Sequence, residues 1–321
     1  VAFRCNFATV DDEMHIVDRR AGRIREGTKE LADALNGMVI DGITVLFKEA
    51  TEHRAVMVLR GENLSSAISD TDPKKEGLRI KTSTAKDDSK EAAFTADLLN
   101  KVIVKAHEIL KNHPLNIKRI EEGKFSANCI VTRGAGKMPK IKKITEKLKF
   151  KACCVAAEDT VLGVANLAGF ETIHKSSFTG NIDTNIEEKA KAAVEALKTN
   201  DLVVLHYKAT DLMGHDNNPQ GKVETIEKYD NMLKIVLDLI KEEKLDDVII
   251  ALAADHSTPC ERKEHSGDPV PVLINGKSIR KDYVEKYDEI SCSQGGLNRI
   301  KGSDFISILL DYLELTVKQG N

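Results

Sequence analysis

The chain contains no tryptophan, and aromatic residues make up only 4% of its 321 residues. Few aromatic rings are therefore available to stack on nucleic acid bases. The net charge is also small, because 48 lysines and arginines stand against 51 aspartates and glutamates, which gives −3. Neither feature supports nucleic acid binding, and we expect no nucleic acid partner.

Long apolar runs and paired cysteine motifs are missing as well. No run approaches the roughly 20 apolar residues of a membrane span, and no signal peptide is visible. None of the six cysteines has the C-x-x-C spacing of a redox or zinc motif. We therefore expect reduced, buried thiols in a soluble cytoplasmic protein that has no membrane partner.

The sequence opens on VAFRCNFATV, without a methionine, and this segment alternates apolar and polar residues as a strand does. A natural protein seldom begins inside a well-patterned strand. We expect the chain to be a fragment or one piece of a cleaved protein.

Two regions of the chain differ in their hydrophobic pattern. Residues 1–135 carry short strand-like runs at 1–10, 43–47, 54–59 and 127–132, with helical patterns at 28–35 and 92–110. This mixture predicts a compact α+β domain. The glycine-, proline- and lysine-rich segment 136–143 is typical of a linker.

Strands and helices alternate regularly in the second predicted domain, residues 144–321. Strands are expected at 151–157, 202–207 and 247–253, and helices at 159–168, 186–197, 223–243 and 303–315. This order predicts an α/β domain with a mainly parallel sheet and helices on both faces. Ligands of such sheets bind beyond the carboxyl ends of the strands.

Five acidic and histidine residues follow these strands or lie in nearby turns: Asp211, His215, Asp255, His256 and His265. Asp211 and His215 are four residues apart, so one helical turn would place both on one face. A single pair of this kind is more often a cap or a salt bridge. Three such elements in loops at one sheet edge favour a metal site instead.

The residue types narrow the choice of metal. Carboxylates and imidazoles without cysteine suit Zn²⁺ or Mn²⁺, and Co²⁺ is also compatible, whereas a closed structural zinc site is disfavoured. Two metal ions need about six or seven protein ligands, so these five residues fall short of a complete dinuclear site.

The segments KATDLMGHD, ADHSTPC and HSGDPVPVLI resemble the metal motifs of cofactor-independent phosphoglycerate mutases, most closely the archaeal type, within the alkaline phosphatase superfamily. The resemblance extends over nearly the whole chain, through RCNFATV, IVDRRAGRI, HRAVMVLRG, SDTDP, RGAG and GGLNRIKG. It implies an alkaline-phosphatase-like core, incomplete here, with a smaller α+β insert domain.

The resemblance also implies how the ligands divide between two divalent ions. Asp211, His215 and His265 would hold one ion. Asp255 and His256 would hold the other, together with an aspartate and a nucleophilic serine from a segment that precedes Val1. That segment is then a possible partner as a separate piece. A role of Ser257 or Thr258 as the nucleophile is the less favoured alternative, because hydroxyl groups at such positions more often form hydrogen bonds with turn backbone groups or with metal ligands.

The first region supplies candidates for binding a phosphorylated acid, because arginine forks onto phosphate and carboxylate groups. The residues expected to bind substrate are Arg4, Arg19, Arg20, Arg23, Arg54, Arg60, Arg133 and Lys208. Several of these could equally be solvated surface residues, and Arg133 could instead form an ion pair at the hinge. Asp18 and His53 are candidates for proton transfer.

The resemblance predicts a metal-dependent enzyme that interconverts 3-phosphoglycerate and 2-phosphoglycerate through a phosphoserine, in glycolysis and gluconeogenesis. It uses no 2,3-bisphosphoglycerate, and its expected partner, besides the possible separate segment, is the small substrate phosphoglycerate. One alternative is a metal-dependent phosphohydrolase or phosphopentomutase of the same superfamily. The other is a truncated form that binds ligand without turnover, because the nucleophile is not found in this chain.

Overall fold

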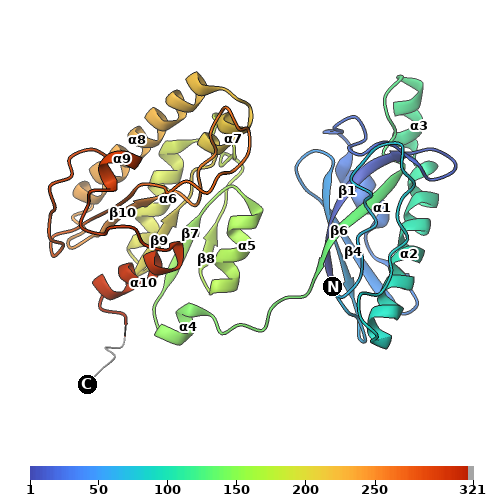
Figure 1. Cartoon of the computed structure of the whole chain (residues 1–321), viewed down its shortest axis with the longest axis horizontal. Helices are drawn as coiled ribbons and strands as arrows, with labels where there is room; N and C mark the ends of the chain where they lie inside the picture. Colours follow the sequence, from blue (N-terminus) through green and yellow to red (C-terminus); the bar gives the residue numbers. More distant parts are fainter. Residues whose placement is uncertain (317–321) are drawn as a thin grey trace. The chain divides into compact units, whose positions relative to one another are not determined.

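A computed structural model of the protein describes residues 1–316. The chain forms two compact units, Val1–Lys140 and Ile141–Asn321 (Figure 1). The boundary lies within the predicted linker, where the last strand of the first unit ends at Gly136 and the next helix begins at Ile144.

The first unit is built on an antiparallel sheet. Its strands are β1 (Ala2–Val10), β2 (Ile16–Asp18), β3 (Met38–Ile40), β4 (Ile43–Glu49), β5 (Arg54–Arg60) and β6 (Cys129–Gly136). They are ordered β2-β1-β5-β4-β3, and β6 also pairs with β1. β1 is thus hydrogen-bonded on both sides, and most of its nine residues are buried.

Three helices complete this unit: α1 (Thr28–Leu35), α2 (Lys90–Lys111) and α3 (Pro114–Glu121). Ser89 caps α2 by accepting a hydrogen bond from the Ala92 amide. Helices α1 and α2 contact each other, and they pack on β4 and β6 (Figure 1). In β5, Ala55, Met57 and Leu59 are buried, whereas the alternating residues are exposed or, at Val58, half-buried, so much of the opposite face of this strand lies open.

In the second unit, β7 (Ala152–Val155) pairs in parallel with β8 (Glu171–Ile173) and with β9 (Leu202–Leu205). The helices around these strands are α4 (Ile144–Leu148), α5 (Asp159–Ala168), α6 (Ile186–Leu197), α7 (Ala209–His215) and α8 (Pro219–Glu242). α6 packs on β9 and on α8, which places α8 in a further layer (Figure 1).

The strand predicted at 247–253 was expected to belong to a mainly parallel sheet, but in the described residues it does not join β7, β8 and β9. β10 (Ile250–Ala253) pairs antiparallel with β11 (Val272–Asn275), and within residues 1–316 these two strands form a sheet of their own. Strand pairing depends on partners far away in sequence, which the local pattern does not specify. Helices α9 (Glu289–Cys292) and α10 (Gly302–Tyr312) follow.

Two simpler expectations can be compared with the structure directly. All six cysteines are free, and four are buried, whereas Cys260 and Cys292 are partly exposed. The predicted free thiols are thus present. The prediction that the thiols are buried is wrong for Cys260 and Cys292, because both lie in or beside loops. No helix in the described part of the chain has the length and apolar character needed to cross a membrane.

Candidate metal centre

Asp211 and His215 lie on α7, the short helix that follows β9 after three residues. One turn of helix separates them, so both side chains emerge on the same face. The distance between His215 Nε2 and Asp211 Oδ1 is 3.5 Å. The carboxyl end of β9 therefore presents an imidazole and a carboxylate together, as the four-residue spacing predicts.

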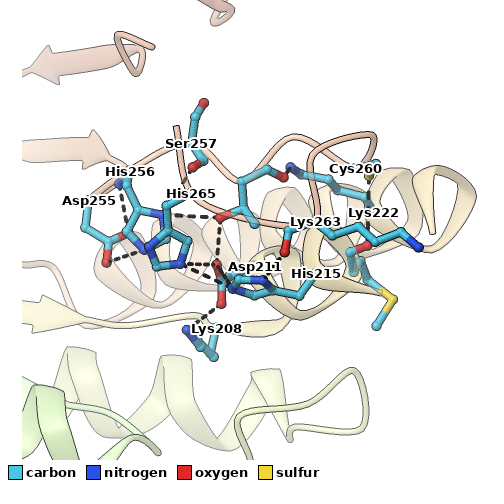
Figure 2. A network of polar contacts seen from close by, with 12 residues as sticks. Lys208, Asp211, His215, Lys222, Asp255, His256, Ser257, Cys260, Lys263 and His265 are labelled. Atoms are coloured by element: carbon cyan, nitrogen blue, oxygen red, sulfur yellow. Dashed lines mark hydrogen bonds and ion pairs between the residues drawn. The ribbon is translucent and has the colours of Figure 1, made fainter. Parts of the chain in front are cut away.

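His265 reaches the same place from the long loop between β10 and β11 (Figure 2). Its Nε2 atom lies 3.4 Å from Asp211 Oδ1 and 3.2 Å from His215 Nε2. A backbone hydrogen bond from Ser266 to the Ser257 carbonyl ties the two sides of this loop together. Three donor atoms from two segments about 50 residues apart thus converge on one point.

This triangle of donors has the size that a divalent ion requires. A tetrahedral zinc site with bonds of about 2.0–2.1 Å places its ligand atoms about 3.3–3.4 Å apart. The observed separations of 3.2–3.5 Å agree with that value. His215 Nδ1 lies 2.8 Å from the Lys263 carbonyl oxygen, so this nitrogen carries the proton and Nε2 keeps its lone pair for a metal. The residues present fit a bound metal ion.

Two neighbours hold the Asp211 carboxylate in place. Lys208 Nζ donates to Oδ2 at 2.6 Å, and the Thr258 hydroxyl donates to Oδ1 at 2.7 Å. Burial raises the pKa of Asp211, but these hydrogen bonds and the Lys208 charge outweigh it and leave the pKa below its ordinary value. The carboxylate is therefore ionised at neutral pH, the form that binds metal.

Thr258 is 4% exposed, and its hydroxyl group also lies 3.2 Å from His256 Nδ1. It thus contacts two candidate ligands at once, which is the supporting role favoured for a hydroxyl group at this position.

Asp255 and His256 lie at the start of the same loop, directly beside the triad. His256 stacks on His265 with ring centroids 3.7 Å apart, and its Nε2 lies 3.4 Å from Asp255 Oδ2. The Asp255 side chain is 80% exposed. Among residues 1–316, this pair belongs to no group of three converging ligands, so two donors are available here for a second ion.

The arginines predicted to bind substrate lie in the first unit, and Lys208 is in the second. Arg4 on β1 is in register with Val56 of β5, and Arg54 and Arg60 are exposed at the two ends of β5. Arg4 is also in register with Arg133 of β6, and burial and the charges of Arg133 and Arg54 lower the pKa of Arg4. Part of the open face of this sheet is therefore cationic.

His53 and Asp18 are placed differently from one another. His53 is 6% exposed, and its Nδ1 atom is buried without a hydrogen-bond partner. Burial and the charges of Arg54, Arg20 and Arg23 lower the pKa of His53 to about 4, so the ring is neutral at pH 7. Asp18 Oδ1 instead accepts backbone hydrogen bonds from Arg20 and Gly22, which gives it a structural role in that loop.

Arg19 and Arg133 meet on a residue that the sequence did not single out, Asp72. Arg19 binds the Asp72 carboxylate through Nε at 3.2 Å and Nη2 at 2.8 Å, and Arg133 Nε lies 3.3 Å from Asp72 Oδ2. The ion pair considered for Arg133 therefore exists within the first unit. The sequence signal that could have identified Asp72 is its place in SDTDP, an acidic motif among predominantly basic motifs.

The family comparison agrees with this geometry. The model of the metalloenzyme superfamily matches residues 32–312, which is most of the chain. The fold and the Asp-His-His cluster thus belong to a metalloenzyme with an alkaline-phosphatase-like α/β core.

Individual relatives give a narrower assignment. The chain is 44% identical over 323 residues to a 2,3-bisphosphoglycerate-independent phosphoglycerate mutase of Methanosphaera stadtmanae, and 46% identical over 320 residues to that of Methanococcus vannielii. Each alignment covers 100% of this chain and 78% of the relative.

Two solved structures are also similar. One is a protein of Pyrococcus horikoshii, with TM-score 0.83, 36% identity, and coverage of 100% of this chain and 75% of that one. The other is the cofactor-independent phosphoglycerate mutase of Thermoplasma acidophilum, with TM-score 0.71, 31% identity, and coverage of 97% and 76%. The chain belongs to the family of 2,3-bisphosphoglycerate-independent phosphoglycerate mutases, which are isomerases.

Proposed function

We propose that this protein interconverts 3-phosphoglycerate and 2-phosphoglycerate by metal-dependent phosphoryl transfer through a phosphoserine, without 2,3-bisphosphoglycerate. The observation that carries the proposal is the convergence of Asp211, His215 and His265 at the carboxyl end of β9. The names of the relatives supply the reaction, and the donor triangle supplies a place for its metal.

Two divalent ions, Mn²⁺ or Zn²⁺ with Co²⁺ as a further candidate, are part of this proposal. Asp211, His215 and His265 would hold one ion, and Asp255 and His256 would contribute to the other. A bound ion stabilises negative charge on a phosphoryl group and lowers the pKa of a hydroxyl nucleophile. The lone pair on His215 Nε2 and the ionised Asp211 carboxylate are the forms that such binding needs.

The nucleophilic serine and one further aspartate would come from a segment outside the given sequence. Support comes from the ligand set, because Asp255 and His256 provide only two donors among the described residues. Thr258, the buried hydroxyl group nearest this pair, already donates to Asp211 and is poorly placed to attack a substrate.

The residues of this chain would bind and orient the substrate. Lys208 lies beside the metal site, where its ammonium group can contact a phosphoryl oxygen as well as Asp211. The arginines of the first unit would hold the carboxylate and the phosphate while the glycerate reorients. His53, neutral at pH 7, can accept a proton but cannot donate one as an imidazolium.

The proposal is tested by following 3-phosphoglycerate by ³¹P NMR with the metal-loaded protein in its natural full length, without added 2,3-bisphosphoglycerate. We expect 2-phosphoglycerate to form with little release of inorganic phosphate, and we expect a chelator to stop the reaction. Steady phosphate release would identify a phosphohydrolase instead. No reaction with phosphoglycerate, but turnover of a phosphopentose, would replace the proposed substrate.

A further inference from the structure

Asp72 lies on the loop between β5 and α2, yet its carboxylate is buried and contacts several hydrogen-bond donors. Its side chain is fully buried, although the loop also contains exposed residues. Each oxygen is used: Oδ1 accepts from the Lys74 amide at 2.7 Å and from Arg19 Nε, and Oδ2 faces Arg19 Nη2 and Arg133 Nε. One buried carboxylate therefore orders two guanidinium groups.

The loop that carries Asp72 is firmly attached to β6. The amides of Thr71 and Asp72 both donate to the Thr132 carbonyl, and the hydroxyl groups of Thr71 and Thr132 are 3.0 Å apart. The Gly134 amide donates to Asp70 Oδ1 at 2.9 Å. Asp72 is thus held at a fixed place beside Arg133, as a positioning residue must be.

The charges of this group do not balance. Arg19 and Arg133 carry two positive charges against one on Asp72, and Arg4 adds a third cation in register with Arg133, whereas Glu76 is a second acid whose charge acts on Arg19. The Arg19 and Arg133 side chains remain 22% and 27% exposed. Each guanidinium has five N–H donors, and Asp72 occupies only some of them, so the others are available to a ligand.

We propose that Asp72 is a positioning residue that fixes Arg19 and Arg133 as a two-guanidinium cradle for an anionic group of the substrate. The cradle takes a carboxylate or a phosphoryl group, because both match the planar fork of arginine. This inference rests on the proposed function, and it adds the residue that orients two of the substrate-binding arginines. Preordered donors bind more tightly because less side-chain entropy is lost on binding.

The test is a double-mutant cycle on binding of 3-phosphoglycerate, measured by titration calorimetry with the metal-loaded, full-length protein. Asp72→Asn keeps the shape of the side chain but removes its charge. We expect it to weaken binding by about tenfold or more. In an Arg19→Ala background the same change should cost less than in the wild type, because one of the two guanidinium groups that Asp72 positions is already gone.

Two further variants separate positioning from folding. Asp72→Glu keeps the charge but displaces it, so we expect weaker binding, with thermal unfolding to show that the variant is folded at the assay temperature. This variant also serves if Asp72→Asn does not fold. Asp33→Asn removes an exposed acid that pairs with Lys29 on α1, and should bind like the wild type. An equal loss from Asp72→Asn with and without Arg19, or unchanged binding by folded Asp72→Asn and Asp72→Glu, would overturn the inference.

Inorganic phosphate and glycerate serve as separate probes. The probe that binds more weakly to Asp72→Asn than to the wild type carries the chemical group that the cradle holds. If wild-type protein binds phosphate at Arg19 with the same coupling to Asp72 but ignores phosphoglycerate, the cradle stands and the proposed function fails. If phosphoglycerate is converted and neither Asp72 nor Arg19 affects its binding, the function stands and the cradle is wrong.

Discussion

At the metal centre each of the three donor residues supplies one corner of a triangle of 3.2–3.5 Å, so loss of any corner leaves only two ligands. We expect His265→Ala to weaken Zn²⁺ or Mn²⁺ binding about a hundredfold or more, measured by titration calorimetry on metal-free protein. His15→Ala, which removes a histidine from the first unit, is the matched control. Binding in His265→Ala equal to the control would remove His265 from the site.

His53 should make the stability of the folded protein depend on pH. Burial and the facing cations Arg54, Arg20 and Arg23 hold its folded pKa at about 4, below its ordinary value of 6.5, and the charge of Glu52 opposes them. From pH 6.5 down to about 4 the unfolded chain gains a proton at this site that the folded chain does not. Stability therefore falls as pH falls through this window.

This contribution can be isolated by comparing wild type with His53→Gln in urea unfolding at pH 7 and pH 4.5. We expect the wild type to lose roughly 2 kcal/mol more than the variant between the two conditions. An identical pH dependence of both proteins would show that the ring is not held neutral in the folded state.

At the scale of elements, the contact between α7 and the loop that carries Thr258 depends on Gly214. A Cβ atom at position 214 would lie 2.3 Å from the Thr258 carbonyl oxygen, so the helix or the loop would have to move. We expect Gly214→Ala to destabilise the protein by about 1–3 kcal/mol and to weaken metal binding. The readouts are thermal unfolding and metal titration.

Gly163→Ala is the control for that variant. Gly163 lies in α5, and a Cβ atom there has no neighbour within 4 Å. Alanine at this position should leave metal binding unchanged and stabilise the helix slightly, by roughly 0.5–1 kcal/mol. Normal metal affinity in Gly214→Ala would show that the close approach does not matter for the site.

The elements differ in how well local sequence predicts them. Helices α1, α5 and α6 have the predicted bounds, because their apolar periodicity covers their whole length. Strands β2, β3 and β8 were not predicted, because three residues are too few to show a period, and β11, with four residues, was not predicted either. The pairing of β10 with β11 depends on residues 272–275, which the pattern of β10 does not encode.

The candidate site shows the same limit. The spacing of Asp211 and His215 predicts their shared helix face, since one turn joins them. The approach of His265 and the role of Asp72 depend on contacts across about 50 residues or more, which local patterns do not contain. The residue types and turn positions included His265 among the five candidate ligands, but its grouping with Asp211 and His215 on one ion came from the family resemblance.

At the scale of the whole molecule, metal binding should stabilise the folded protein, because the three ligands come together only when it folds. A free metal concentration 100 times the dissociation constant would add about 2.7 kcal/mol. We expect scanning calorimetry to show a higher transition temperature with metal than with chelator. The increase should be absent in Asp211→Asn, and an equal increase in that variant would indicate metal binding elsewhere.

The central claim is that Asp211, His215 and His265 hold a divalent ion, and anomalous X-ray scattering from crystals of the metal-loaded protein tests it most directly. The account predicts an anomalous peak about 2.0–2.2 Å from Asp211 Oδ1, His215 Nε2 and His265 Nε2. A fully loaded protein whose anomalous peaks all lie away from these three atoms would contradict it.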